Sequence, residues 1–328
     1  MKRWILWIGL AISIILVFVS VRALKLDEVM RGLQTANLWW LIPGMIAYFV
    51  SVGLRSWRWS ALLNPYKRIS FSRLYPIVVI GYMGNNIYPA RIGELVRAYV
   101  LRQKEGVPIA YSISTVFLER IVDGLVVAAF VLIGLPKVPN LPENMHSFVL
   151  IASGLFLVAI VVFVTLALAP KLADQLAYSV LSRILPAKLQ PPILHFVQKF
   201  VEGAQCLRSP RDLIFIFLTS VIAWGFETLK YWFVMQAFSL NLSFVALMLL
   251  NGASNLATII PSGPGFVGTY DAASIGVLTA LGVDRDLAAA YTIVLHAALW
   301  LPVTLLGFYF MLREGLHWSD FKQAEKIS

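Results

Sequence analysis

Long apolar segments alternate with short polar connections along nearly the whole chain. The apolar segments cover residues 4–21, 38–54, 74–88, 111–135, 148–169, 213–238, 242–260, 266–281 and 287–312. A membrane-spanning helix needs about 20 consecutive apolar residues, with a range of about 17–25. The pattern therefore predicts an all-α, polytopic membrane protein: seven or eight crossing helices and one or two re-entrant or broken helices, folded as a single integral membrane domain over residues 1–328.

The composition supports the same class. Of the 328 residues, 59% are hydrophobic and 13% are charged, and the mean hydropathy is +0.78. A soluble domain of this size needs far more polar surface. The net charge of +10 then belongs mostly to the connections, where it indicates orientation and attraction to anionic headgroups rather than nucleic-acid binding. Cys206 is the only cysteine and the four histidines lack metal-ligand spacing, so we predict no disulfide framework, no metal site and no cofactor.

The basic connections predict the orientation in the membrane. Five basic residues and no acidic residue lie between positions 55 and 73: Arg55, Arg58, Lys67, Arg68 and Arg73. The positive-inside rule makes this connection cytoplasmic and places the N-terminus on the same side. Basic residues at positions 313, 322 and 326 keep the C-terminus inside as well. We therefore expect a multi-pass protein of the inner cell membrane with both termini in the cytoplasm.

Two further stretches bear on the topology. Residues 4–21 follow two basic residues, as in a signal peptide, but the apolar run is longer than the roughly 7–15 residues of a signal core. We expect an uncleaved first helix, with cleavage near residues 21–23 as the alternative. The longest polar connection, residues 171–211, has the spacing of amphipathic helices, which we expect to lie on the cytoplasmic surface.

A break interrupts the apolar pattern at Pro89. Proline lacks an amide hydrogen and clashes with a continuing helix, and the segment before it, residues 74–88, is short for a full crossing. Residues 91–105 are again rich in Arg and Lys. A full crossing would place them outside, against the charge rule, so a re-entrant hairpin is favoured. A plain short span is the alternative.

Polar side chains flank this break. Arg91, Glu94 and Arg97 repeat at i,i+3 and share a face of the helix that follows. The start of a helix favours an anion, and the guanidinium fork matches a phosphate. Together with Asn85 and Asn86, these residues are candidates for binding a lipid headgroup. Arg97 has the alternative role of reaching the membrane surface from a helix end.

A second group of charges, Glu119, Arg120 and Asp123, lies within about one turn of the predicted helix 111–135. Ionisable groups at membrane depth are costly and indicate function by default. Arg120 could hold a lipid phosphate while the two acids position it. The alternative is a self-neutralising cluster that joins helices. Glu227 and Lys230, another i,i+3 pair, are interpreted as structural.

A second break, at residues 261–265, separates the apolar segments 242–260 and 266–281. Its glycines and prolines expose backbone amides before a helix that contains Asp271. Asp271 is a further headgroup candidate, with helix capping as the alternative. The spacing does not match a phosphate loop. His296, in the last apolar segment, is interpreted as a packed or hydrogen-bonded helix residue.

The two breaks resemble each other, because in both an Asn precedes a Pro, followed by Gly and then a carboxylate. Paired interrupted segments in the two halves of a chain point to the binding site of a transporter, and they suggest a two-fold pseudo-repeat. Two independent membrane turns are the alternative. The predicted break or hinge residues are Pro89, Gly93, Pro261, Gly263, Pro264, Gly265 and Gly268.

Three ordered motifs, at residues 85–97, 119–123 and 260–268, resemble the flippase-like membrane family related to the transmembrane region of lysylphosphatidylglycerol synthase. The resemblance covers nearly the whole chain. In the larger synthases the membrane region is thought to move an aminoacylated phospholipid between leaflets, and a separate soluble domain performs the aminoacyl transfer. The resemblance implies that this chain, which we expect to lack that domain, moves a lipid made elsewhere. Asp271 stands where the family is expected to carry Glu.

The leading hypothesis is therefore a lipid flippase whose partners are membrane lipids, above all anionic phospholipid, and a lipid-modifying enzyme. In this hypothesis Arg91 and Arg120 hold the phosphate while Glu94, Asp123 and Asp271 balance charge. A membrane-embedded transferase acting on a lipid carrier and a small-solute transporter are the alternatives. The oligomeric state, the lipid, and the direction and energy source of its movement are not predicted.

Overall fold

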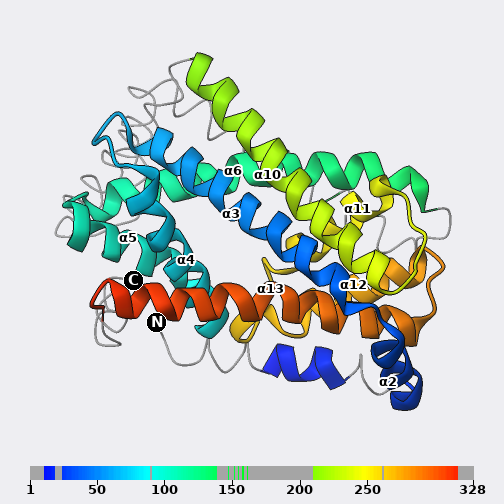
Figure 1. Cartoon of the computed structure of the whole chain (residues 1–328). Helices are drawn as coiled ribbons and strands as arrows, with labels where there is room; N and C mark the ends of the chain where they lie inside the picture. The colour runs from blue at the N-terminus through cyan, green and yellow to red at the C-terminus, as the bar shows by residue number, and fades with distance from the viewer. Residues whose placement is uncertain are drawn as a thin grey trace.

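The computed structural model describes residues 11–18, 24–88, 91–138, 210–260 and 262–316, together with positions 147, 151, 154, 157, 158 and 161. Within these residues the chain is helical and contains no strand (Figure 1). The prediction of an all-α membrane fold is confirmed. Nearly all of the predicted connection 171–211 and of the segment 148–169 lies outside the described residues, as do Pro89 and Pro261.

Nine α-helices and three short 3₁₀ helices make up the continuous described ranges after residue 24. The α-helices are α2 (Leu26–Thr35), α3 (Leu41–Leu63), α4 (Phe71–Ile87), α5 (Ile92–Glu105), α6 (Ile109–Gly134), α10 (Pro210–Ala237), α11 (Phe244–Ala257), α12 (Thr269–Ala280) and α13 (Arg285–Arg313). The 3₁₀ helices are η1 (Leu38–Trp40), η2 (Leu135–Lys137) and η5 (Pro264–Phe266). Residues 11–18 are also helical.

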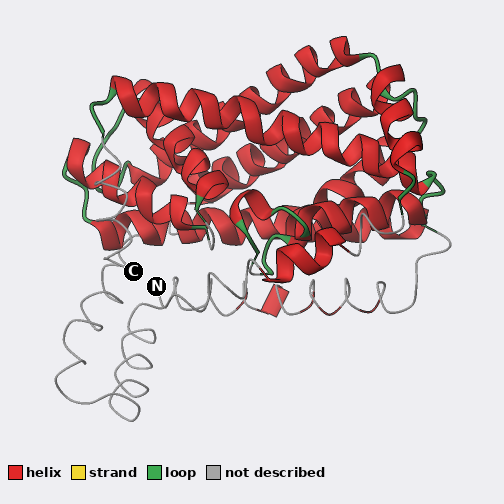
Figure 2. Ribbon diagram, turned by 90° about the horizontal axis from the view of Figure 1, so that it is seen from below, coloured by secondary structure: helices red, strands yellow, loops and turns green. Residues whose placement is uncertain are grey.

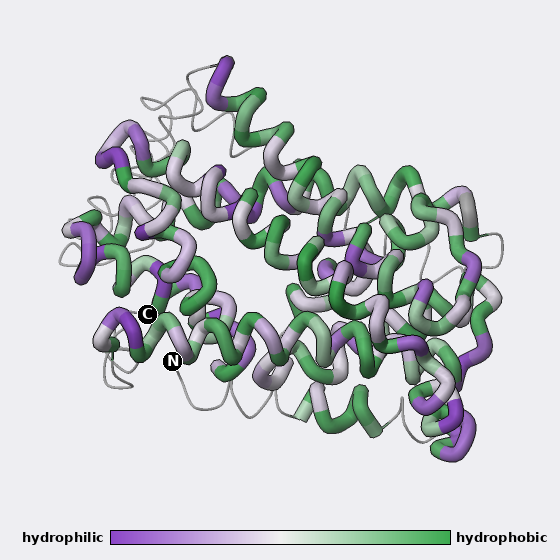
Figure 3. The backbone as a smooth tube through the Cα atoms, viewed as in Figure 1, coloured by the Kyte–Doolittle hydropathy of each residue, from purple (hydrophilic) through white to green (hydrophobic). Residues whose placement is uncertain are grey.

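Three of the described helical segments are long and apolar enough to cross a membrane: Leu38–Leu63, Arg211–Ala237 and Arg285–Arg313. α6 has 26 residues, about 39 Å at a rise of 1.5 Å per residue, but carries three charged residues in its middle. Apolar positions follow the long helices, whereas polar positions concentrate at their ends and recur inside the bundle (Figure 3). The polar interior is where the chain departs from a simple hydrophobic bundle.

The prediction that the second span ends at Leu54 is wrong. α3 continues to Leu63, and it carries Arg55 and Arg58 inside the protein, where they are 7% and 0% exposed. These two residues are therefore not part of a cytoplasmic connection. The physical reason is that their guanidiniums find buried carboxylates on other helices, which offsets the cost of burying charge.

α4 and α5 form a helical hairpin, as the break at residue 89 predicts. At its open end, Glu105 at the end of α5 meets Arg73 near the start of α4, with Nη1 and Oε1 3.0 Å apart. Lys67 Nζ lies 2.9 Å from Glu105 Oε2. The chain therefore enters and returns at the same end of the bundle. α4 is 17 residues long, about 26 Å, which is short of the roughly 30 Å hydrocarbon core.

α11 and α12 form a second hairpin, with 14 and 12 residues. Its tip, residues 258–268, contains η5 and, among the residues described there, three with positive φ: Gly265 (φ 67°), Phe266 (φ 62°) and Gly268 (φ 92°). The helical residues 11–18 lie against this tip. The Ser13 hydroxyl accepts a hydrogen bond from the Gly263 amide and donates one to the Val267 carbonyl, both at 2.7 Å.

The two halves of the bundle pack with the same pattern. α3 packs along α10; α13 packs along α4, and correspondingly α6 packs along α11. Helices α3, α4, α5 and α6 therefore correspond, in this order, to α10, α11, α12 and α13, because the helix contacts of the first set have equivalents in the second. α3 and α10 run antiparallel, since Trp40 stacks on Phe233 whereas Trp57 contacts Phe215. This packing agrees with the predicted two-fold pseudo-repeat, in an inverted form. α3 and α10 lie side by side in Figure 1, and Figure 2 shows the same helical bundle from below.

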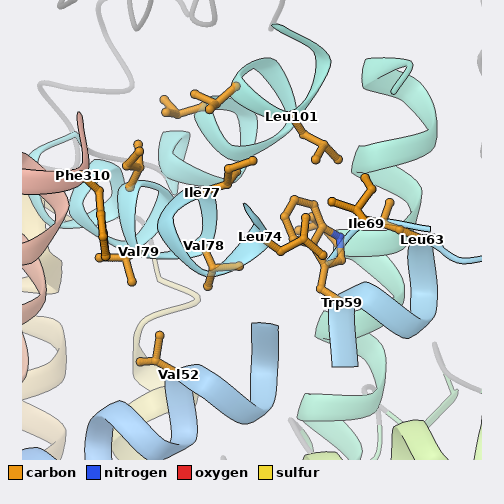
Figure 4. Packing of buried hydrophobic residues seen from close by; sticks show 14 of the residues in the cluster. Val52, Trp59, Leu63, Ile69, Leu74, Ile77, Val78, Val79, Leu101 and Phe310 are labelled. Atoms are coloured by element: carbon orange, nitrogen blue, oxygen red, sulfur yellow. The ribbon is translucent and has the colours of Figure 1, made fainter. Parts of the chain in front are cut away.

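Each hairpin has its own apolar core. One cluster surrounds α4 and α5 and includes Trp59, Leu74, Ile80 and Leu101, all fully buried. Figure 4 shows Trp59 of α3 among Leu74, Ile69 and Leu63; its indole N–H donates to Thr115 Oγ1 at 3.0 Å. The other cluster surrounds α11 and α12. The two cores hold the hairpins so that their tips meet in the middle of the bundle.

Candidate functional site

A cavity of about 160 Å³ lies where the two hairpin tips meet. We call it the chamber. Contacts across the tips define its walls: Arg91 Nη2 donates to Thr258 Oγ1 at 2.7 Å, and the Arg91 guanidinium lies 5.5 Å from the ring centre of Phe266. Polar lining residues come from α3, α6, α10, α13 and both hairpins: Arg55, Asn85, Asn86, Arg91, Arg120, Glu227, Asn255, Thr258 and His296.

Asp123 of α6 is the centre of an ionic network beside the chamber. Its carboxylate, on a residue 3% exposed, receives Arg55 Nη1 at 3.1 Å and Arg58 Nη1 at 2.6 Å. Arg58 Nη2 adds a second contact at 3.1 Å. Charge-assisted and bidentate contacts of this kind are the strongest hydrogen bonds in proteins. Asp123 therefore fixes two arginines that the hydropathy pattern assigned to a loop.

Glu119 joins the first hairpin to this network. Arg97 Nη1 of α5 lies 2.8 Å from Glu119 Oε2, and Arg58 Nη2 lies 3.7 Å from its other oxygen. The Arg97 guanidinium is 3.5 Å from the ring centre of Trp59, a cation–π contact. Arg97 is only 4% exposed, so the alternative that it reaches the membrane surface is wrong.

Glu227 and Lys230 of α10 form the pair that the sequence interpretation treated as structural. Lys230 Nζ donates to Glu227 Oε1 and is itself 1% exposed. Glu227 also accepts from Ser51 Oγ at 3.1 Å and lies 3.9 Å from Arg55 Nη2. This pair therefore extends the network from α3 to α10 and contributes a carboxylate to the chamber wall.

Arg91 and Arg120 face the chamber with weaker partners. Arg120 Nε lies 3.7 Å from Glu94 and its Nη2 lies 3.5 Å from Asp123, and the Nε atom has no hydrogen-bond partner within the described residues. Arg91 Nη1 is 3.9 Å from Glu94. These separations exceed the usual 2.7–3.2 Å of an N–H···O bond. The side chains of Arg120 and Arg91 are 28% and 33% exposed, more than those of the other arginines in the network.

Arg91 adopts a backbone conformation that L-residues seldom use, with φ 56° and ψ 32°. Such positions cost free energy and persist where the surrounding structure holds them. Here the left-handed turn ends the first hairpin tip and starts α5. It directs the Arg91 side chain across the tip toward Thr258 rather than along its own helix.

The network carries an excess of positive charge. It contains six cations, Arg55, Arg58, Arg91, Arg97, Arg120 and Lys230, and four carboxylates, Glu94, Glu119, Asp123 and Glu227. Two positive charges therefore remain among these described residues. Since the cations with the longest carboxylate contacts are Arg91 and Arg120, the excess is exposed to the chamber. An anion of one or two charges is the natural complement.

Asp271 and His296 meet beside the second hairpin tip. His296 Nδ1 lies 2.6 Å from Asp271 Oδ1, and its Nε2 lies 2.9 Å from the Gly265 carbonyl oxygen. Asp271 Oδ2 accepts from the Gly268 amide at 2.8 Å. Asp271 thus both caps α12 and pairs with a residue of α13. His296 is therefore a hydrogen-bonded residue, and the carboxylate that it contacts lies on α12 rather than on its own helix.

The remaining candidates occupy the hairpin contacts. Asn86 Nδ2 donates to Thr304 Oγ1 at 2.8 Å, whereas the Asn85 side-chain oxygen has no hydrogen-bond partner among the described residues. Gly93 lies in the first turn of α5, where α4 approaches most closely. Pro264 opens η5.

Sequence reasoning missed the roles of Arg55, Arg58 and His296. Arg55 and Arg58 are three residues apart and Ser51 precedes Arg55 by four, so all three share one helix face. That spacing was the available signal that the second span continues. The Asp271 partner of His296 has no such signal, because 25 residues separate the two.

These features define a class of protein: a multi-pass, all-α membrane protein with two helical hairpins and a charged chamber between their tips. The family model described as "Lysylphosphatidylglycerol synthase TM region" matches residues 6–307. The chain belongs to this family, which confirms the resemblance seen in its motifs.

Three related proteins are 22–25% identical to this chain. The chain is 25% identical to the UPF0104 membrane protein PH1989 of Pyrococcus horikoshii, over 95% of this chain and 97% of that protein. It is 22% identical to a UPF0104 membrane protein of Methanothermobacter thermautotrophicus, over 93% and 92%. It is also 24% identical to the glycosyltransferase AglD of Haloferax volcanii, over 91% of this chain but only 52% of that protein.

Proposed function

We propose that this protein is a lipid translocase of the inner membrane that accommodates an anionic lipid headgroup in the chamber. The observation that carries the proposal is the excess of two positive charges beside the cavity, with Arg91 and Arg120 lacking close carboxylates. A lipid phosphate supplies both the charge and the oxygen geometry that guanidinium groups recognise. The acyl chains stay in the bilayer while the headgroup passes.

The two hairpins provide the means of movement in this proposal. They enter from opposite ends of the bundle, and their tips share the chamber walls through Arg91, Thr258 and Phe266. Displacing one hairpin opens the chamber toward one end and leaves the other closed. Inverted repeats with broken helices at the binding site are typical of transporters that work by alternating access.

Leaflet exchange of a labelled phosphatidylglycerol in reconstituted vesicles tests the proposal. Wild-type protein is expected to accelerate exchange, and Arg120→Ala and Arg91→Gln are expected to reduce it about 10- to 100-fold, since a hydrogen bond to a charged group contributes about 1.5–3 kcal/mol. Arg102→Gln, a change of an exposed arginine at the open end of the first hairpin, is the matched control and should exchange lipid at the wild-type rate. Equal rates for wild type and Arg120→Ala would refute the headgroup role.

A membrane-embedded transferase is the second candidate, because one relative is named a glycosyltransferase. The chain aligns with about half of that protein, so the activity in its name can reside in either part. Incubating the purified protein with native membranes and measuring lipid masses separates the two candidates. A translocase leaves the masses unchanged, whereas a transferase yields a lipid of altered mass. Solute uptake into vesicles without lipid movement would instead favour a small-solute transporter.

A further inference from the structure

The contact between His296 and Asp271 requires a bound proton. A carbonyl oxygen only accepts hydrogen bonds, so the Gly265 carbonyl 2.9 Å away places a hydrogen on His296 Nε2. In a neutral ring Nδ1 then carries a lone pair. An ionised Asp271 also offers only lone pairs, and the two atoms are 2.6 Å apart. The contact is attractive only when one further proton lies between Nδ1 and Oδ1.

The surroundings favour holding this proton as an imidazolium–carboxylate pair. Asp271 stands in the first turn of α12 and accepts from the Gly268 amide at 2.8 Å, and the positive end of a helix stabilises a carboxylate. With the proton the pair is neutral overall. Without it the pair carries one negative charge and loses its hydrogen bond.

The position of the pair connects it to the chamber and to a second cavity. His296 lines the chamber, and His296 and Asp271 also line an adjacent apolar cavity of about 360 Å³. Their side chains are 15% and 22% exposed. The pair is therefore shielded from bulk solvent yet open to small species in both cavities, as a proton site must be.

The charges that face the pair decide when the proton is held. On α12 the Tyr270 ring centre lies 4.9 Å from the His296 ring. Across the chamber lie Arg91, Arg120, and Arg55 beside the Glu227–Lys230 pair. Among the described residues that line the apolar cavity, the ionisable ones are Asp271 and His296 themselves. The empty chamber is thus positive, which favours the deprotonated, negative state of the pair; an anion in the chamber removes that bias.

Proton loss also has a mechanical consequence. Gly265, Gly268 and Asp271 belong to the second hairpin tip and the start of α12, whereas His296 belongs to α13, so the shared proton ties this tip to α13. The same tip carries Thr258 and Phe266, which contact Arg91. Repulsion between Nδ1 and Oδ1 would loosen the tip that closes the chamber.

We propose, on the basis of the translocase function above, that the His296–Asp271 pair is the proton site of the protein. It takes up one proton from water when an anionic headgroup enters the chamber and returns it when the headgroup leaves. Coupling between two binding sites is reciprocal: bound lipid holds the proton, and proton loss weakens lipid binding. Each anionic lipid then moves together with one proton.

The test measures proton uptake during lipid binding. Dihexanoyl phosphatidylglycerol, whose phosphodiester stays ionised across the range used, is added to the purified protein in weakly buffered detergent solution with a pH-indicator dye, and its affinity is measured from pH 5 to 9 by calorimetry. Wild-type protein is expected to take up as much as one proton per bound lipid. Its affinity should fall with rising pH by as much as about tenfold per unit, the limit for one linked proton.

Variants separate the proton site from the headgroup site. His296→Gln and Asp271→Asn should bind the lipid without proton uptake and with an affinity independent of pH. Glu28→Gln, which neutralises an exposed acid on α2, should behave as wild type. Sulfate, an anion without acyl chains, should give no uptake at the same concentration, and equal uptake with sulfate would overturn a lipid as the linked ligand.

The two proposals fail in different ways. If wild-type protein binds the lipid without taking up protons, or if both variants take up as many as wild type, the proton site is overturned and the translocase function stands. If wild-type protein binds no phosphatidylglycerol, the translocase function is overturned and the proton coupling with it.

Discussion

Replacing Asp123 by Asn is expected to lower the free energy of unfolding by about 3–5 kcal/mol, the usual cost of removing one partner from a buried ion pair. The Asp123 carboxylate lies within 3.1 Å of Arg55 and Arg58 and 3.5 Å of Arg120. The variant leaves these cations facing a neutral amide and raises the net charge of the network from two to three. Thermal unfolding of the purified protein in detergent, followed by tryptophan fluorescence, measures the loss.

Two further variants show whether the loss comes from unpaired charge. Asp27→Asn changes an exposed acid on α2 and should unfold within about 0.5 kcal/mol of wild type. The double variant Arg55→Gln/Asp123→Asn removes one cation with the carboxylate, so it should be more stable than Asp123→Asn alone. A single variant as stable as wild type, or a double variant less stable than the single, would contradict this account of the network.

Replacing Gly93 by Ala is expected to destabilise the first hairpin by about 3 kcal/mol, the upper part of the range for overpacking. A Cβ atom at this position would lie 1.9 Å from the Gly81 carbonyl oxygen and 2.5 Å from the Asn85 backbone nitrogen. Backbone atoms on α4 cannot yield as a flexible side chain does. α4 and α5 must therefore separate, and the tip that carries Arg91 must move with them.

The same unfolding measurement, together with lipid exchange, checks this prediction. Gly225→Ala is the matched control, because a Cβ added at this helical glycine meets no atom within 4 Å. It should leave stability unchanged or raise it slightly, since Ala favours a helix more than Gly does. A Gly93→Ala protein with wild-type stability would mean that the two helices are not packed backbone to backbone.

The hairpins show how far local sequence signals reach. Pro89 and the prolines and glycines after residue 260 marked both breaks, because proline cannot continue a helix. The charge rule then selected a returning hairpin at residues 74–105, and the structure has one. Each of these inferences depends on neighbouring residues in the chain, which is why it could be made without coordinates.

The arginines of α3 show where such signals stop. Arg55 and Arg58 follow an apolar run of ordinary length, next to Trp57 and Trp59, and resemble the basic end of a span. Their burial depends on Asp123, Glu119 and Glu227, which lie 61 or more residues away in the chain. A local pattern cannot show whether a charge has such a partner. The partner decides whether burying the charge stabilises or destabilises the folded protein.

By itself, the sequence determined the class of this protein, the positions of both breaks and the family, because hydropathy, proline geometry and ordered motifs are local properties of the chain. The tertiary structure alone decided that the two hairpin tips meet, that Arg91 and Arg120 keep their charge facing a cavity, and that His296 contacts Asp271. Each of these depends on distances of a few ångströms between distant residues, and electrostatic and hydrogen-bond energies change steeply over such distances.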